Sequence, residues 1–220
     1  MANCVPLRAG DSDGAARVKI HNVKQGQPEW HLIRSGMPSA SRFKELVTPT
    51  GKPSTSITKY SHELLAERLS GSPFESISTF SMRRGIELEP MAADVFTFQT
   101  DLITREVGYV TNDDETVGCS PDRLVEDIGL EIKCPNHVTH TQYLLGGELP
   151  GEHKAQVQGT IWLMGIEEYW FMSFHPQLPN FICKVYRDDK YISVLESQIQ
   201  RLLEMLEEAQ EKIGEMDGVR

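Results

Sequence analysis

The chain has 220 residues, of which 39% are hydrophobic, and 22 basic against 32 acidic residues give it a net charge of −10. This length predicts one domain with a sizeable core, residues 1–220. No run of about 18 apolar residues occurs, which excludes a membrane-spanning helix, and residues 1–20 lack the apolar stretch of a signal peptide.

Cysteine use and charge distribution narrow the class of protein further. The four cysteines are scattered without a Cys-x-x-Cys pair, which predicts reduced thiols in a cytoplasmic protein. The acidic balance argues against strong nonspecific binding of nucleic acid by a monomer. Residues 188–220, however, hold nine acidic and four basic residues, which is half of the net charge. An acidic surface helix there leaves room for a local basic strip elsewhere.

The N-terminal part is predicted to be an irregular arm followed by a helical lobe. Glycines and polar residues favour irregular chain over 1–25. The lobe, residues 26–78, contains three apolar stretches with helix start signals, of which the first begins at Pro28. We expect its helices at 28–34, 40–47 and 61–69.

Residues 79–187 predict a catalytic core that alternates helices with strands. A long helix over 79–100 should kink or restart before Pro90, which lacks a backbone N–H. The strands are expected at 106–111 (an edge strand), 122–126, 130–134, 169–175 and 181–187, and further helices at 139–145 and 152–164. An amphipathic helix over 191–216 follows within the C-terminal segment 188–220. The predicted fold class is α/β (α+β), a central mixed β-sheet flanked by helices.

The stretch from Cys119 to Pro135 contains the strongest chemical signal. It reads as two short strands with a turn at 127–129, which brings Asp122 alongside Glu131. Side chains alternate along a strand, so Glu131 and Lys133 share one face while Ile132 packs inward. Two carboxylates and a backbone carbonyl suit a hard divalent cation, and an adjacent ammonium can hold an attacking water.

Taken alone, this acid-x-Lys pattern is also compatible with a solvated strand face that carries an ion pair. Two features favour a site: no other charge interrupts residues 129–135, and the wider chain matches a family, as shown below. Two acidic residues, Glu87 and Glu89, lie near the expected kink in helix 79–100. Of these, Glu89 is the candidate third ligand, and a solvated helix face fits Glu87 better.

Two other groups of polar residues are candidates for substrate contact. Arg34 is followed by Ser39 and Ser41 at a helix start, where N–H groups and a guanidinium can receive a phosphate. On this spacing alone, an ordinary capped helix is the favoured interpretation. His153 and Gln156 are three residues apart and share a helix face, which indicates either a site or a buried hydrogen-bond network.

Several blocks of the chain resemble the phage lambda exonuclease family, the YqaJ-type viral recombinase branch of the PD-(D/E)xK nucleases. They occur in the family's order over nearly the whole chain beyond residue 25. The blocks are Trp30-His31, Arg34, Gly36, Ser39-Ala40-Ser41, Gly85, Glu89, 119–122, 129–135, 145–147, 155–158, Trp162 and 189–191.

This resemblance implies roles for individual residues. Asp122, Glu131 and the Ile132 carbonyl resemble the metal ligands, and Lys133 resembles the catalytic lysine. The remaining matches are the helix carboxylate Glu89, the helix glutamine Gln156, and the phosphate or DNA contacts Arg34, Ser39, Ser41 and Ser120. His153 stands where the family often has tyrosine, so its place among the DNA contacts departs from the family's pattern.

The family implies a restriction-endonuclease-like core and a Mg²⁺-dependent 5′→3′ exonuclease on linear double-stranded DNA, with Mn²⁺ as a substitute. It further implies a ring-shaped homotrimer, a single-strand annealing protein as partner, and a phage or prophage protein in a bacterial cytoplasm that generates 3′ overhangs for recombination. The alternatives are a structure-specific or restriction-like endonuclease on the same core and a non-catalytic DNA-end-binding module. A complete Asp, Glu and Lys set argues against the latter.

Overall fold

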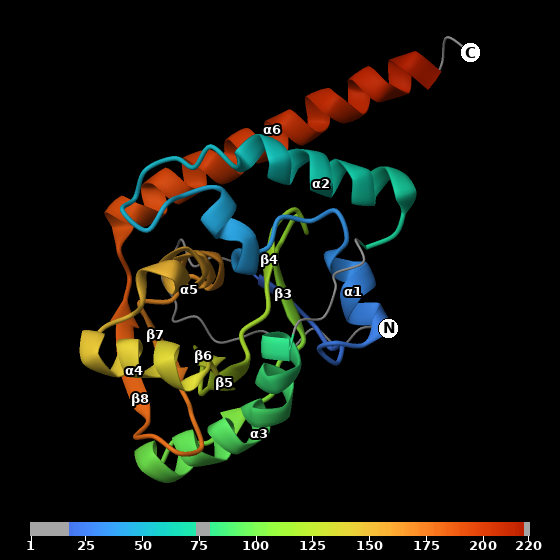
Figure 1. The fold of residues 1–220 in the computed structure, drawn as a ribbon. Coiled ribbons are helices and arrows are strands. Elements are labelled where there is room, and N and C mark those ends of the chain that lie inside the picture. Colours follow the sequence, from blue (N-terminus) through green and yellow to red (C-terminus); the bar gives the residue numbers. More distant parts are fainter. Residues whose placement is uncertain (1–17, 74–79, 218–220) are drawn as a thin grey trace, which may run out of the picture.

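The computed structural model describes residues 18–73 and 80–217 (Figure 1). The irregular arm predicted for residues 1–25 lies largely outside these residues. Its last part is not irregular, because Val18–His21 form strand β1, which pairs antiparallel with β3 (Tyr109–Asn112). The assignment of the whole chain to a single domain stays a prediction.

A five-stranded mixed sheet forms the centre of the molecule, which confirms the predicted fold class. The strands lie in the order β2-β5-β6-β7-β8, with β6 and β7 parallel and the other neighbours antiparallel. Their bounds are β2 Thr104–Arg105, β5 Arg123–Val125, β6 Ile128–Lys133, β7 Glu168–Ser173 and β8 Phe181–Tyr186.

Helices cover both faces of this sheet. Parallel strands need a long crossover, and α4 (His137–Gly146) and α5 (Gly151–Met164) form it between β6 and β7. They pack on the face of Tyr169 and Phe171. On the opposite face α3 (Phe80–Thr100) packs its alanines and Phe96 against the apolar side chains of β5, β6 and β7. This helix is continuous through Pro90, so the predicted restart does not occur.

The predicted edge strand at 106–111 is wrong. The chain leaves the large sheet after β2 and enters a separate three-stranded sheet, in which β3 lies in the middle between β1 and β4 (Gly118–Cys119). Gly108 marks this transition, since a Cβ there would stand 2.3 Å from the His21 carbonyl oxygen. Residues 107–111 are all buried, so no alternation between two faces marks which sheet the segment joins.

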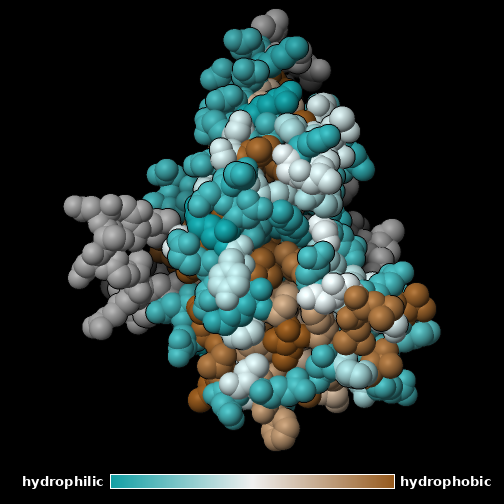
Figure 2. Space-filling model, turned by 90° about the vertical axis from the view of Figure 1, so that its left-hand side faces the viewer, coloured by the Kyte–Doolittle hydropathy of each residue, from teal (hydrophilic) through white to brown (hydrophobic). Residues whose placement is uncertain are grey.

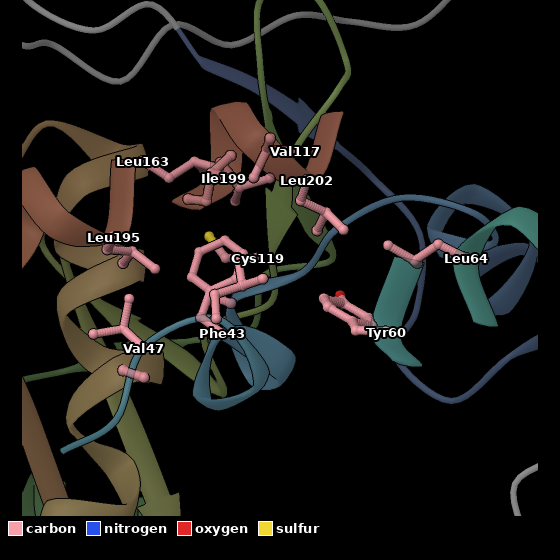
Figure 3. Close-up of a cluster of buried hydrophobic side chains, with 14 of the residues drawn as sticks. Phe43, Val47, Tyr60, Leu64, Val117, Cys119, Leu163, Leu195, Ile199 and Leu202 are labelled. Atoms are coloured by element: carbon pink, nitrogen blue, oxygen red, sulfur yellow. The ribbon is translucent and has the colours of Figure 1, made fainter. Parts of the chain in front are cut away.

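The 3₁₀ helix η1 (Ala40–Glu45) and helices α2 (Ile57–Ser70) and α6 (Asp189–Asp217) share one hydrophobic cluster with α5 and the small sheet. Figure 3 shows Phe43 at its centre, with Cys119 from β4 and Leu195 and Ile199 from α6 around it. Phe43 packs so closely on α5 that a Cβ at Gly159 would stand 2.2 Å from its ring. Helix α1 (Pro28–Arg34) has no buried residue and lies outside this cluster.

The 29-residue helix α6 runs alongside α2 and then projects beyond it (Figure 1). The predicted stripe of α6 faces the core, with Ile192, Leu195, Ile199, Leu202 and Leu206 buried and Ile213 partly buried. Its projecting end forms the top of Figure 2 and is mainly hydrophilic. Among the helices that the structure describes, none combines the length and hydrophobicity of a membrane span.

Candidate active site

The hairpin of β5 and β6 places Asp122 beside β6. Strand β5 begins at Arg123, opposite Leu130, so the next part of β6 has no backbone partner on that edge. The Asp122 side chain bonds this part of β6 instead: its Oδ2 accepts a hydrogen bond of 2.7 Å from the backbone N–H of Ile132. The N–H and C=O of one strand residue point to the same edge. The Ile132 carbonyl therefore faces the edge at which Asp122 lies.

The turn of this hairpin is shorter than predicted. Val125 pairs with Ile128, which leaves Glu126 and Asp127 as a two-residue turn, with Glu126 in the left-handed region at φ 55°. Gly129 suggested a turn residue, but it lies inside β6. A Cβ at that position would stand 2.1 Å from the Tyr169 ring. This glycine is therefore required by packing between β6 and β7.

Glu131 is the most buried carboxylate of the site, with 1% of its surface exposed. Its Oε1 accepts hydrogen bonds from Lys133 Nζ at 2.5 Å and from Gln156 Nε2 of α5 at 2.6 Å. Its Oε2 is also buried but has no hydrogen-bond partner among the residues that the structure describes. A buried carboxylate oxygen without a partner is costly, which is evidence that the site is shaped for a further group.

The protonation behaviour of the three charged residues reflects this burial. Burial, and then the charge of Asp122, raise the pKa of Glu131 to about 7. Burial also raises the pKa of Asp122 above its usual range. For Lys133, burial disfavours the ammonium, but the charges of Glu131 and Asp122 outweigh it and raise the pKa. One ammonium thus faces two desolvated carboxylates, and this excess of negative charge favours a bound cation.

We call Asp122, Glu131, Lys133 and the Ile132 carbonyl the acid centre. Its oxygen donors fit a hard divalent cation such as Mg²⁺, and the partnerless Oε2 of Glu131 is the observation that supports the fit. Among the described residues, no three His, Cys, Asp or Glu side chains come together as a ready ligand set. The acid centre offers two carboxylates and a carbonyl, and a cation bound there would keep water ligands.

The predicted third carboxylate, Glu89 on α3, pairs with Arg123 rather than pointing freely at the acid centre. Arg123 Nη1 donates both to Glu89 Oε1 and, at 2.8 Å, to the backbone carbonyl of Asp122. Burial and the charge of Asp122 raise the pKa of Glu89 in spite of this pairing. Glu89 therefore lies close enough to sense the acid centre, and Arg123 connects the two.

His153 forms a hydrogen-bond chain on the α5 side. Burial and Glu152 raise the pKa of Tyr143, so its hydroxyl keeps its proton and donates a hydrogen bond to Glu152. The Tyr143 oxygen then accepts from His153 Nε2 at 3.1 Å. Burial, and then the charge of Lys133, lower the pKa of His153 to about 4. At neutral pH this residue would meet a phosphate as a neutral ring rather than as a cation.

The second group of predicted residues also comes together. The Arg34 guanidinium lies 3.8 Å from the centroid of the Trp30 ring and donates to Ser41 Oγ at 3.3 Å. Ser39 Oγ is 3.4 Å from Ser41 Oγ. Ser39 occupies the N-cap position of η1 but makes no side-chain cap, contrary to the expected capping role. We call Arg34, Ser39 and Ser41 the arginine cradle.

The arginine cradle adjoins the acid centre through Trp30. Its indole Nε1 donates to Ser120 Oγ at 3.0 Å, and Ser120 is two residues from Asp122. Burial lowers the pKa of Arg34. No carboxylate among the described residues forms an ion pair with it. A partly buried cation without an anionic partner is suited to an incoming anion.

Comparison with known proteins identifies the family of this chain. A profile of the YqaJ-like viral recombinase domain matches residues 29–167, well over half of the chain. The chain belongs to this family. The crystal structure of an alkaline exonuclease (LHK-Exo) from Laribacter hongkongensis has a TM-score of 0.78 and 31% identity, covering 87% of this chain and 98% of that one. The structure of LHK-Exo in complex with dAMP matches over the same shares, with a TM-score of 0.78 and 32% identity.

A more distant structure supports the YqaJ-like fold alone. The phage related exonuclease from Haemophilus somnus 129PT has a TM-score of 0.63 and 14% identity, covering 80% of this chain and 96% of that chain. The sequence matches none of the curated proteins.

Three residues of this YqaJ-like site were not predicted from the sequence. Arg123 directly follows Asp122, and this adjacency was the only available signal for it. Tyr143 and Glu152 orient His153 from separate helices. Their aromatic and acidic characters are common on helix surfaces, so no sequence signal marked them.

Proposed function

We propose that this YqaJ-like protein is a Mg²⁺-dependent 5′→3′ exonuclease that digests linear double-stranded DNA and leaves 3′ single-stranded overhangs. The observation that carries the proposal is the buried, partnerless Oε2 of Glu131 beside Asp122 and Lys133. The similarity to an alkaline exonuclease at 31% identity supports the reaction class. The PD-(D/E)xK arrangement at Asp122, Glu131 and Lys133 supports phosphodiester hydrolysis.

The roles of the acid centre follow from its contacts. Asp122, Glu131 and the Ile132 carbonyl would hold Mg²⁺, with Mn²⁺ able to replace it. When bound, the cation lowers the pKa of a water and neutralises charge on the leaving oxygen. Gln156 and Lys133 both donate to Oε1 of Glu131, which fixes the carboxylate and leaves Oε2 for the cation. The Lys133 ammonium, charged at neutral pH, orients the nucleophilic water and stabilises negative charge in the transition state.

The arginine cradle supports the 5′→3′ polarity. A terminal 5′-phosphate carries more charge and more free oxygens than an internal phosphodiester, so a cation without a counter-ion discriminates between them. Arg34 is held by the Trp30 ring, and Trp30 also binds Ser120 next to the acid centre. A 5′ end bound at Arg34, with Ser39, Ser41 and Ser120 as hydroxyl donors, would present the following phosphodiester to Asp122 and Glu131.

We further propose that the protein works as a ring-shaped homotrimer with a single-strand annealing protein, in the cytoplasm of a bacterial host that carries the phage or prophage. A net charge of −10 gives weak electrostatic affinity for DNA. A closed ring retains its substrate by topology instead. The projecting, acidic half of α6 would then lie away from the DNA.

The test uses linear duplex DNA labelled at either the 5′ or the 3′ end, incubated with Mg²⁺. We expect the 5′ label to be released first as a mononucleotide, the 3′ strand to remain, and EDTA to stop the reaction. Covalently closed circular DNA should stay intact. Earlier release of the 3′ label would refute the polarity, cutting of the circle would indicate an endonuclease, and no release with any divalent cation would indicate a non-catalytic protein.

A further inference from the structure

A second group of basic residues lies beyond the acid centre and is not explained by the roles assigned above. Arg83 and Arg84 of α3 and the segment after β7 enclose a pocket of about 690 Å³. The pocket is lined by Arg83, Arg84, Glu87, Leu88, His175, Pro176 and Gln177. We call it the Arg84 pocket.

The cations of this pocket lack anionic partners. Neither Arg83 nor Arg84 forms an ion pair with any carboxylate that the structure describes, and Arg84 Nε is buried without a hydrogen-bond acceptor. Glu87 is exposed at the pocket and opposes an anion, but the two guanidinium groups outnumber it. A buried guanidinium N–H without an acceptor is costly unless a ligand supplies one.

His175 adds a neutral donor to the pocket. Its Nδ1 accepts a hydrogen bond of 3.3 Å from the Gln177 backbone N–H, which places the proton of the neutral ring on Nε2. Burial, and then the charge of Arg84, lower the pKa of His175, so the ring is neutral near pH 7. Two guanidinium groups and an imidazole N–H form a donor set that suits a phosphate group.

The pocket adjoins the acid centre at the carboxyl ends of the parallel strands. Lys133 and Ser173 are paired at these ends, and the Phe174 N–H donates to the Lys133 carbonyl at 2.8 Å. His175, which lines the pocket, directly follows Phe174 in the chain. The backbone therefore links the Arg84 pocket to the strand end that carries Lys133.

These contacts give a path across the molecule. The arginine cradle meets the acid centre through Ser120, and the Arg84 pocket meets it through the backbone hydrogen bond from Phe174 to Lys133, next to His175. We infer that the Arg84 pocket binds an internal phosphodiester of the DNA strand whose 5′ end occupies the arginine cradle. This inference rests on the proposed function, because it assumes a strand that crosses the acid centre. Arg84 would act as a positioning residue that sets the register of the scissile bond.

The test measures DNA binding without cleavage, in EDTA, by fluorescence anisotropy of a 5′-phosphorylated linear duplex. We expect Arg84→Gln to weaken binding about tenfold and to reduce the slope of log affinity against log salt by about one. Arg201→Gln, which removes an exposed arginine of α6, is the matched control and should change neither. An unchanged salt slope in Arg84→Gln would overturn the inference.

A scan with uncharged methylphosphonate linkages identifies the phosphate. In the wild-type protein, we expect one internal linkage near the 5′ end to weaken binding when it is neutral, and this penalty should vanish in Arg84→Gln but persist in Arg34→Gln. Equal penalties in the wild-type protein and Arg84→Gln at every linkage would overturn the assignment. Arg84→Lys covers the case in which the glutamine variant fails to fold, and it should keep the salt slope while losing part of the affinity.

A free nucleotide carries a phosphate group too, so a separate experiment must distinguish nucleotide binding from DNA binding in the Arg84 pocket. If a 5′-mononucleotide inhibits wild-type digestion, and Arg84→Gln loses only this inhibition while its DNA affinity and salt slope stay unchanged, the pocket holds released product and the inference is wrong. The proposed exonuclease activity and the role of the Arg84 pocket can be refuted independently of each other. Absence of nucleotide release by the wild-type protein with Mg²⁺ removes the exonuclease, whereas the linkage scan, which needs no cleavage, decides the pocket.

Discussion

The acid centre and the arginine cradle lie side by side but are built differently. All members of the acid centre come from one hairpin, residues 122–133. Its two carboxylates accept hydrogen bonds of 2.5–2.7 Å from the Ile132 N–H, from Lys133 and from Gln156 of α5. The arginine cradle combines α1 with the start of η1, and its contact from Arg34 to Ser41 is longer, at 3.3 Å, and exposed. Rigid, buried groups suit chemistry, whereas an accessible group suits the capture of a DNA end.

The two sites also carry uncompensated charge of opposite sign, negative in the acid centre and positive in the arginine cradle. In the acid centre, burial raises the pKa of both carboxylates, because one ammonium does not compensate for two buried anions. In the arginine cradle, burial lowers the pKa of Arg34, and no carboxylate among the described residues forms an ion pair with it. Each site therefore lacks a counter-charge that a ligand can supply, a cation in the first case and a phosphate in the second.

Removing the charge of Glu131 should have the largest effect. Glu131→Gln keeps an oxygen that can accept from Lys133 and Gln156, but it removes the charge that faces the cation. We expect the rate of nucleotide release in Mg²⁺ to fall on the order of 10³-fold, with the circular dichroism spectrum and DNA affinity retained. Glu196→Gln, at an exposed position of α6, is the matched control and should leave the rate unchanged. Near-wild-type release by Glu131→Gln would refute the acid centre.

The free energy of unfolding of the metal-free protein should depend on pH, because the pKa of Glu131 is raised by burial. Glu131 has a pKa of about 7 when folded, against an ordinary value of 4.5, so the folded state retains a proton that the unfolded state releases. This contribution to the free energy of unfolding is complete below pH 4.5 and is lost as the pH rises through about 7. The expected loss is about 3 kcal/mol.

Urea denaturation in EDTA between pH 5 and pH 8 measures this loss. The wild-type protein should lose stability over that range relative to Glu131→Gln, because the glutamine does not titrate and the remaining groups are shared. Added Mg²⁺ should stabilise the wild-type protein most at the upper end of the range. Parallel pH profiles for the two proteins would show that Glu131 is not destabilised by its burial.

The difference in construction explains what the sequence could predict. The acid centre lies within twelve residues, so strand alternation alone put Glu131 and Lys133 on one face and the hairpin brought Asp122 beside them. The fold class and most helices were also predicted, because their hydrophobic periodicity is local. The turn was misplaced since Gly129 is required by the Tyr169 ring, a residue forty positions away.

Long-range pairing was the main source of error. Nothing within residues 106–111 indicated that β3 pairs with Val18–His21, so the segment was assigned to an edge. Likewise, the ion pair between Glu89 and Arg123 depends on how α3 packs against the sheet. The contact from Trp30 to Ser120, which brings the arginine cradle to the acid centre, joins residues ninety positions apart.

The smallest expected effect separates capture of the DNA end from chemistry. If Arg34 binds the terminal phosphate, the wild-type protein should digest a 5′-phosphorylated duplex about tenfold faster than a 5′-hydroxyl duplex, as one charge-assisted contact implies. Arg34→Gln should digest both at the slower rate, because the acid centre is untouched. Arg105→Gln, which removes another exposed guanidinium, should keep the preference. A preference that survives Arg34→Gln would place the phosphate site elsewhere, and a loss of rate on both ends would mean that Arg34 supports the acid centre itself.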